Sequence, residues 1–173
     1  MQIEKLIRNK AKCLKCGEVA ESKSGHDFRR CKCGAIAVDG GLEYRRGVME
    51  SHDIYEDQSE YYTLHYPTWD DYKAGKQPIK VEFSKHVTLE HRRKLLRDWL
   101  TQGEFVVTFK KIDGELRNMP CTIQEGKVPV VESKTGRVKK PNDEVMSVYA
   151  TDKNEWRSFR VENVLSIEMK EQV

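Results

Sequence analysis

The chain has 173 residues, enough for one ordinary domain or two small ones. Hydrophobic residues make up 38% of it and the mean hydropathy is -0.75, which indicates a polar protein with small cores. Its 31 Lys and Arg nearly balance its 28 Asp and Glu, so the net charge of +3 does not by itself indicate a nucleic-acid-binding protein. No stretch has the composition of a signal peptide or approaches the roughly 18 apolar residues of a membrane-spanning helix. We therefore expect a cytoplasmic protein with no membrane partner.

Four of the five cysteines lie close together near the start of the chain. A Cys-x-x-Cys-Gly motif occupies residues 13–17, and a Cys-x-Cys-Gly motif occupies residues 31–34. Disulfides are rare in a reducing cytoplasm, so this clustering favours a metal site. Zinc takes four thiolates at tetrahedral corners, and a turn followed by glycine brings two thiolates together while backbone amides point at the sulfurs. The predicted zinc ligands are Cys13, Cys16, Cys31 and Cys33.

A zinc ion with four protein ligands has no open coordination position. We therefore expect this zinc to be structural and to contribute directly to folding. Two alternatives stay open from the sequence. His26 could replace one cysteine, or the cysteines could form an iron–sulfur centre or a cluster without metal.

No catalytic motif accompanies the cysteines. The chain has no Gly-rich phosphate loop, no Gly-x-Ser-x-Gly and no His-Glu-x-x-His. Cys121 stands alone in a strand-like stretch, and no histidine follows His91, so we expect Cys121 to be a small buried hydrophobe and not a nucleophile. These observations favour a binding protein over an enzyme.

Composition divides the chain into three parts. Residues 1–47 contain eleven Lys or Arg against six Asp or Glu, and we interpret them as a basic, zinc-ribbon-like domain. Residues 48–83 are interpreted as an acidic, aromatic linker, because the stretch 51–71 has six acids, five aromatics and no Lys or Arg. That stretch could instead pack its aromatics on the C-terminal domain, or act as an arm that binds a partner or imitates the charge of DNA.

A helix is predicted from about residue 88 to residue 102. Thr88 suits the N-cap position, and Gly103 suits a left-handed residue after the helix end. Apolar residues recur at near-helical spacing along one side, and the other side is basic. The basic side could be an ordinary solvated surface or could contact phosphate.

Short strands are predicted after the helix. Asp113-Gly114 between two β-rich runs, 104–111 and 115–123, predicts a hairpin. Three more strands are predicted, at residues 145–151, 156–161 and 164–169. The stretch 126–144 is predicted to be a long loop between strands. Five short strands joined mainly by tight turns predict a small, strongly bent sheet or barrel.

The last predicted hairpin contains the sequence Trp-Arg-Ser-Phe-Arg-Val, from Trp156 to Val161. In a strand, Arg157 and Arg160 point to opposite faces, so we expect that they are not both simply exposed if one face is core. An arginine on a rigid strand is suited to bidentate binding of phosphate or carboxylate. The alternative is an ion pair with a neighbouring acid, namely Asp152, Glu155 or Glu162.

Two parts of the chain resemble known families. Residues 7–41, with their four cysteines, His26-Asp27-Phe28 and Asp39-Gly40-Gly41, resemble a small cysteine-rich domain of uncharacterised function from Gram-positive bacteria and their phages. Residues 104–170 resemble short phage-encoded SH3-like barrel proteins related to WYL domains, which are regarded as sensors of ligands, often nucleic acid or nucleotides. The second resemblance implies a ligand-binding face that contains Arg117, Trp156, Arg157 and Arg160.

Together these features predict an α+β protein in which a small zinc ribbon, residues 1–47, is followed by the linker 48–83. A helix and a five-stranded SH3-like antiparallel barrel then occupy residues 84–173. We expect a phage or mobile-element accessory protein, a regulator or counter-defence factor, that binds nucleic acid or a host protein that handles nucleic acid. The residues expected to contact phosphate are Lys12, Lys15, Arg29, Arg30, Arg92, Arg93 and Arg97. The alternative is a protein that sequesters a nucleotide signal.

Overall fold

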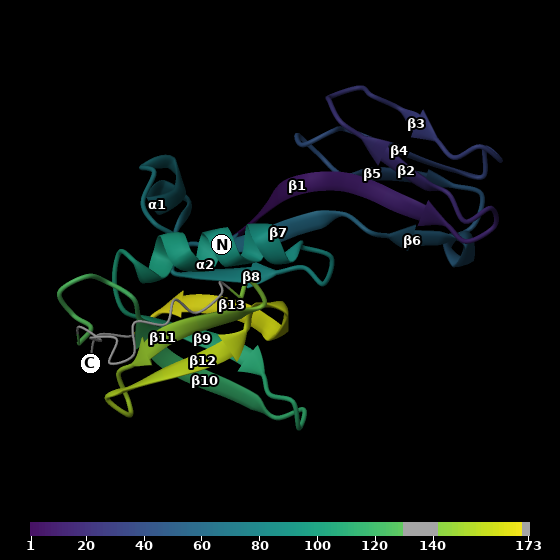
Figure 1. The fold of residues 1–173 in the computed structure, drawn as a ribbon. Coiled ribbons are helices and arrows are strands. Elements are labelled where there is room, and N and C mark those ends of the chain that lie inside the picture. Colours follow the sequence, from purple (N-terminus) through teal and green to yellow (C-terminus); the bar gives the residue numbers. More distant parts are fainter. Residues whose placement is uncertain (130–141, 171–173) are drawn as a thin grey trace. The chain divides into compact units, whose positions relative to one another are not determined.

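The computed structural model describes residues 1–129 and 142–170. The described chain is mostly β structure with few helices (Figure 1). It divides into two compact units, Met1–Leu64 with Ser84–Val87 and His65–Phe83 with Thr88–Val173, which we call the ribbon unit and the barrel unit. Within the described residues, every helix is too short or too polar to cross a membrane.

Strands of two sheets build the ribbon unit. In the first, the long strand β1 (Gln2–Cys13) pairs with β2 (Val19–Ser22) and with β6 (Tyr55–Asp57), and β7 (Glu60–His65) lies next to β1. The second sheet has the order β3-β4-β5, formed by Arg29–Arg30, Ile36–Asp39 and Arg46–Met49. A short 3-10 helix, His52–Ile54, follows β5. The core between the sheets consists of Ala11, Cys13, Ala20, Cys31, Ala35, Ile36 and Val38.

The turn after β4 explains the Asp-Gly-Gly sequence at residues 39–41. Gly40 and Gly41 have φ angles of 104° and 53°, a region in which side chains other than hydrogen are strained. A Cβ atom on Gly40 would lie 2.2 Å from the carbonyl oxygen of Tyr44, and one on Gly41 would lie 2.4 Å from the backbone of Ser24. Both positions therefore require glycine for space as well as for backbone conformation.

Residues 48–83, interpreted from the sequence as a linker, carry regular structure in both units. They include β6 and β7 of the ribbon unit, and helix α1 (Trp69–Lys73) and strand β8 (Lys80–Phe83) of the barrel unit. Strand β6 pairs with β1 from Ala11 to Cys13, and β8 pairs with β13 (Val164–Met169). An acidic composition does not exclude strands, because strand pairing depends on partners far away in the sequence.

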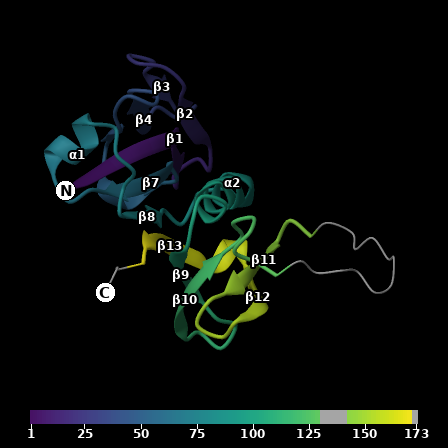
Figure 2. The ribbon, with the colours of Figure 1, turned by 90° about the vertical axis from the view of Figure 1, so that its left-hand side faces the viewer.

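The predicted helix and strands of the barrel unit are confirmed. Helix α2 spans Leu89–Leu100, and the hydroxyl of Thr88 accepts a hydrogen bond from the backbone N–H of His91. The strands are β9 (Phe105–Lys110), β10 (Leu116–Thr122), β11 (Val145–Ala150), β12 (Glu155–Arg160) and β13, with a 3-10 helix at Val161–Asn163. Gly114, with φ of 90°, forms the turn between β9 and β10. Figure 2 shows α2 beside these curled strands.

Two details differ from the prediction. Gly103 is not among the residues with positive φ, because helix α2 ends in a right-handed turn at Thr101 whose N–H bonds to Arg97 and Trp99 carbonyls. The sheet is also not a closed barrel of five strands. Its order in this unit is β12-β11-β10-β9-β13-β8, and β12 is an open edge. Of the predicted loop 126–144, residues 130–141 lie outside the described part of the chain.

The opening has a local cause in the strand register. Strands β9 and β10 pair over six residue pairs and so do β11 and β12, but β10 and β11 pair only at Cys121–Ala150 and Thr122–Tyr149. The pocket described below lies between the tip of the β9–β10 hairpin and the end of the β11–β12 hairpin that is away from its turn, at Val145 and residues 158–160.

Candidate metal centre and ligand pocket

The structure brings the four predicted ligands Cys13, Cys16, Cys31 and Cys33 together. Their sulfur atoms all lie within 4.8 Å of one another. The Sγ of Cys33 is 3.7 Å from that of Cys13 and 3.4 Å from that of Cys31. A zinc ion with Zn–S bonds of about 2.3 Å at tetrahedral corners would separate its ligands by about 3.8 Å. The cluster therefore has the size and the donor set to bind a metal ion such as zinc.

Backbone N–H groups point at the sulfurs, as expected for a thiolate cluster. The backbone of Glu18 bonds to the thiol of Cys16 and lowers its pKa. Burial opposes ionisation of Cys31, yet hydrogen bonds from the backbone of Ile36 and from the other cysteines lower its pKa to about 6. The cluster thus stabilises a thiolate, the form that binds metal. His26 is not part of it.

The glycine after each cysteine motif has a defined role. Gly17 and Gly34 have φ angles of 77° and 79°, and their N–H groups bond to the carbonyl oxygens of Cys13 and Cys31 at 2.8 and 2.9 Å. Glycine adopts this left-handed conformation without strain. The carboxylate of Glu18 accepts a hydrogen bond from the backbone of Lys32 and so links the two turns.

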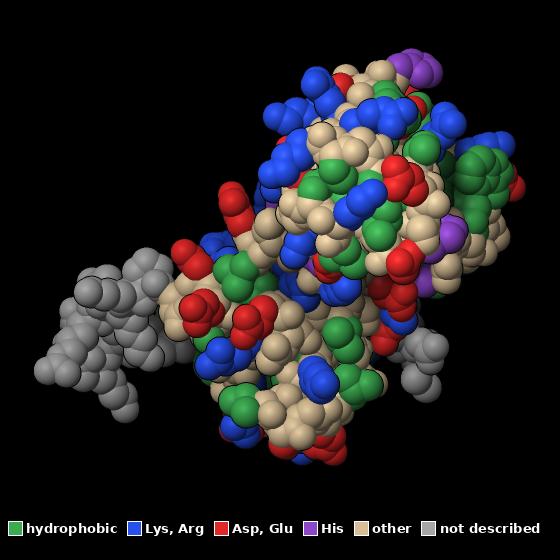
Figure 3. Space-filling view, turned by 90° about the vertical axis from the view of Figure 1, so that its right-hand side faces the viewer, with side chains coloured by type: hydrophobic (Ala, Val, Ile, Leu, Met, Phe, Trp, Pro, Cys, Tyr) green, Lys and Arg blue, Asp and Glu red, His purple; other side chains and the backbone are tan. Residues whose placement is uncertain are grey.

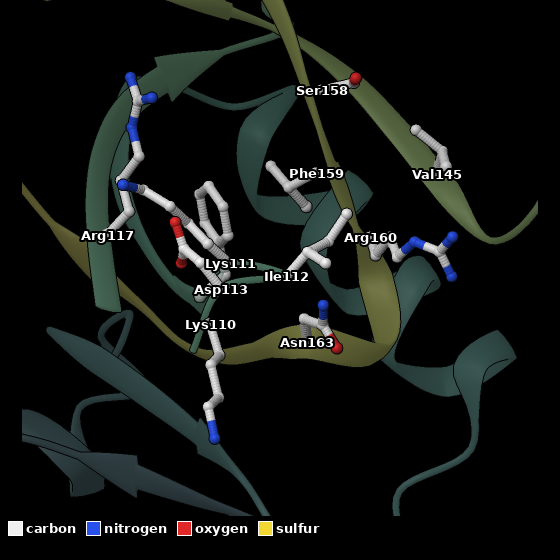
Figure 4. A pocket seen from close by; sticks show the side chains of 11 residues that line it. Lys110, Lys111, Ile112, Asp113, Arg117, Val145, Ser158, Phe159, Arg160 and Asn163 are labelled. Carbon is white, nitrogen blue, oxygen red and sulfur yellow. The ribbon is translucent and has the colours of Figure 1, made fainter. Parts of the chain in front are cut away.

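A pocket of about 680 Å³ opens in the barrel unit between the tip of the β9–β10 hairpin and the β11–β12 hairpin. Phe109 and Phe159 are buried beside it with ring centroids 5.4 Å apart. Ile112, 92% exposed, stands at its mouth. Figure 4 shows Arg117 and Arg160 on opposite sides of this space, with the guanidinium group of Arg160 directed outward. The pocket thus combines an apolar interior with a cationic rim.

Several charged groups at the rim already have partners. Lys111 pairs with Glu115, and Arg160 lies 3.3 Å from Glu162. Within the described residues, the Arg117 side chain forms no ion pair. Lys110 at the rim likewise forms no ion pair within the described residues, and Asp113 also lines the pocket. Of the two cations without an ion pair, only Arg117 can bind an anion through two parallel hydrogen bonds, so we expect it to dominate any binding of an anion.

The structure separates the four residues that the resemblance placed on a ligand-binding face. Arg117 and Arg160 line the pocket, whereas Trp156 and Arg157 do not. Trp156 packs edge-to-face on Tyr149, and Arg157 pairs with Glu155. Arg157 and Arg160 are both exposed, contrary to the prediction, because only Phe159 of β12 is buried. Phe109, Phe159 and Lys111 also line the pocket, and no local sequence signal marks them, because their shared location depends on how the two hairpins curl.

Residues 93–165 match the family model WYL_2, described as an Sm-like SH3 beta-barrel fold. This match confirms the predicted SH3-like domain and its relation to WYL domains. Residues 5–49 match a domain of unknown function (DUF7695), which includes all four clustered cysteines. No curated protein and no solved structure matches the chain. The family match places the pocket within the WYL_2-like domain, since its lining residues run from Phe109 to Asn163.

The predicted phosphate-binding residues on helix α2 are mostly used inside the WYL_2-like domain. Arg92 is 5% exposed and donates to the carbonyl oxygens of Glu162 and Val164 at 2.8 and 2.6 Å. Arg93 donates to the carbonyl oxygens of Asp143 and Val145. These bonds hold the helix on the strands, so the structure does not support a phosphate contact by Arg92. Arg97 is exposed and stays a candidate.

The four candidates in the ribbon unit differ in their contacts. Arg29 pairs with Asp27 at 2.5 Å, and Lys15 lies 3.4 Å from Glu50. Arg30 donates to the carbonyl oxygen of Gly34 and lies over the ring of Phe28. Lys12 is partly exposed on β1. Exposed pairs of this kind are weak, so phosphate can displace them.

Cys121 is fully buried in β10, as expected for a small hydrophobe. Burial raises the pKa of its thiol to about 12. At mildly alkaline pH the thiol therefore stays protonated and should react slowly with iodoacetamide. We expect peptide mapping to find Cys121 unmodified in the folded protein and modified in denaturant. Rapid modification of Cys121 in the folded protein would contradict this burial.

Proposed function

We propose that Cys13, Cys16, Cys31 and Cys33 hold one structural zinc ion. The observation that supports this is the group of four sulfurs within 4.8 Å, with backbone amides directed at them. The ion would join two turns that lie far apart in the sequence and would compensate for burying thiolates in a small core. Its four protein ligands would leave no position for a substrate, so its contribution would be to folding.

We further propose that the protein acts by binding nucleic acid, or a host protein that handles nucleic acid, and that the pocket of the WYL_2-like domain recognises one nucleotide unit. The supporting observation is the cationic rim of Arg117, Lys111 and Arg160 above Phe109 and Phe159. Arginine on a strand can bind a phosphate through two parallel hydrogen bonds. The apolar interior and Ile112 would cover a base or sugar.

A free nucleotide is the second candidate ligand. The volume of about 680 Å³ lies in the range of pockets that enclose a small molecule, and the rim chemistry suits a phosphate whether it is free or part of a chain. The two sources differ in salt dependence. Binding of a polymer that contacts several cations releases several counterions, so its affinity falls steeply as the salt concentration rises. The affinity for a single nucleotide should fall less.

The pocket is tested by the substitution Arg117→Gln, which keeps the length of the side chain and removes its charge. Loss of one hydrogen-bonded charge pair costs about 1.5–3 kcal/mol, so we expect the affinity for oligonucleotide or nucleotide to fall by tenfold or more. The matched control is Arg157→Gln, an exposed arginine of the same domain that lies outside the pocket. Fluorescence anisotropy with labelled oligonucleotides and calorimetry with nucleoside phosphates, each across a salt series, provide the affinities.

Three outcomes decide between the candidates. A steep salt slope together with loss of oligonucleotide binding in Arg117→Gln would support nucleic acid as the ligand. Binding of a mononucleotide alone, with a shallow salt slope, would support the sequestering alternative. Equal affinities for Arg117→Gln and Arg157→Gln would exclude the pocket as the binding site. The phage origin, the counter-defence role and the cytoplasmic location stay predictions.

A further inference from the structure

The β3-β4-β5 sheet of the ribbon unit has one face toward the core and one outer face, which is exposed at Arg30 and Val48 of the edge strands, while Ala37 between them is 1% exposed. Ile36 and Val38 of β4 point into the core, so Ala37 between them faces the other way. The register places Arg30 of β3 and Val48 of β5 opposite Ala37. Residues opposite each other in antiparallel strands share a face. The outer face therefore carries Arg30, Ala37 and Val48 in one row.

Phe28 and Arg46 extend this outer face. Phe28 lies two residues before Arg30, and Arg46 is opposite Asp39, two residues after Ala37. The Phe28 side chain is 43% exposed, and the guanidinium carbon of Arg30 lies 5.3 Å from the centre of its ring. This is cation–π geometry, which orients the ring and the guanidinium together. An exposed aromatic ring beside an ordered arginine is a platform on which a planar group can stack.

The charge of the outer face is positive. Arg30 and Arg46 form no ion pair within the described part of the chain. The acids in the same rows are Asp39, which is buried, and Glu50, which lies opposite the backbone of Ala35 and pairs with Lys15. Figure 3 shows Lys and Arg side chains on the surface in view, with hydrophobic side chains and some Asp and Glu side chains between them. The accessible charge beside Phe28 is therefore cationic.

We propose that this outer face, defined by Phe28, Arg30, Arg46 and Val48, binds single-stranded nucleic acid. An unpaired base stacks on Phe28 and covers Val48, while Arg30 and Arg46 contact the phosphates. A single strand fits because a duplex keeps its bases stacked inside, where a ring on a flat sheet cannot reach them. The inference rests on the proposed nucleic-acid function and assigns it a second contact surface, separate from the pocket of the WYL_2-like domain.

The cysteine cluster adjoins this face. Arg30 directly precedes the proposed ligand Cys31, and its guanidinium donates to the carbonyl oxygen of Gly34 at 3.2 Å, within the second cysteine turn. Strand β3 has only two residues and pairs with β4 at Arg29–Val38 and Arg30–Ala37. So short a strand depends on the cysteine turn that follows it. Stacking on Phe28 should therefore require the intact cysteine cluster.

The experiment compares the affinities of the full-length, metal-loaded protein and its variants for a labelled oligothymidylate, measured by fluorescence anisotropy. Phe28→Ala should weaken binding by about tenfold, because base stacking on an aromatic ring contributes about 1–3 kcal/mol. Phe28→Trp should retain the affinity. Arg30→Gln should lower the slope of log affinity against log salt by about 0.7, the value for one phosphate contact on a single strand.

Matched controls lie elsewhere in the ribbon unit. Val19→Ala removes an exposed apolar side chain on β2, and Lys5→Gln removes an exposed cation on β1. Both should leave the affinity unchanged. If Phe28→Ala binds as tightly as Val19→Ala, or if a duplex binds more tightly than the single strand, the inference is wrong. The pocket would still stand on the Arg117→Gln result. Wild-type protein that binds no oligonucleotide would overturn this inference together with the nucleic-acid function, and would leave only the free nucleotide as the ligand of the pocket.

Discussion

Replacing Cys13 with serine is expected to unfold the ribbon unit and to leave the barrel unit folded. Cys13 is fully buried and belongs both to the sulfur cluster and to the core of the ribbon unit. Apparent free energies of structural zinc binding are about 10–16 kcal/mol in small zinc domains, more than a core of this size can replace. Amide NMR spectra should lose the dispersed signals of the ribbon unit alone, and native mass spectrometry should show the zinc lost.

The control for Cys13→Ser is Cys121→Ser, which alters a buried cysteine outside the cluster. That variant should keep its zinc and the signals of the ribbon unit. A chelator should reproduce the Cys13→Ser spectrum in the wild-type protein, and added zinc should reverse the change. If the ribbon unit keeps dispersed signals without metal, metal binding by the cysteines is not required for its fold.

Replacing Glu60 with glutamine should destabilise the ribbon unit by about 3–5 kcal/mol, because it breaks a buried ion pair and leaves a cation without its partner. The Glu60 side chain is 0% exposed, and its carboxylate lies 2.9 Å from Lys10 and 3.6 Å from Arg8. A neutral amide cannot compensate for the nearby ammonium group of Lys10. Chemical denaturation of the zinc-loaded protein, followed by signals of the ribbon unit, measures the loss.

Glu21→Gln is the matched control for Glu60→Gln. Glu21 pairs with the same Arg8 at 2.7 Å, but its side chain is 26% exposed. Water solvates the charge that remains when an exposed ion pair is broken. Glu21→Gln should therefore lower the free energy of unfolding by at most about 1 kcal/mol. A larger loss of stability for Glu60→Gln than for Glu21→Gln would show that the effect depends on burial of the carboxylate. Similar losses for the two variants would mean that the Glu60 pair is screened by solvent and contributes little.

Local features of this chain were predictable because each depends on neighbouring residues. Helix α2 is set by Thr88 at its start and by an apolar stripe, and the β9–β10 hairpin by Asp113-Gly114. The cysteine cluster follows from two short motifs whose glycines adopt left-handed turns. In each case the signal is local, although the two cysteine motifs come together only in the folded chain.

Features that depend on distant partners were not predictable from those patterns. Arg92 and Arg97 look alike on a basic helix, yet Arg92 is buried against the carbonyl oxygens of Glu162 and Val164. Composition gave no sign that β6 would pair with β1. Pairing of distant segments depends on side-chain packing and on loop closure, and one sequence read alone contains neither.

Local patterns in the amino-acid sequence were enough to predict the four clustered thiols, the helix and the last five strands. Which of the arginines and aromatic residues can contact a ligand depends on the folded chain. Folding leaves β12 as a sheet edge, places Arg117 in the lining of the pocket, and leaves Phe28 and Arg30 exposed on the ribbon unit. The physical reason is that a side chain is either paired inside the protein or available to a partner. Whether a given side chain is paired or available depends on its burial and on neighbours that come together only when the chain folds.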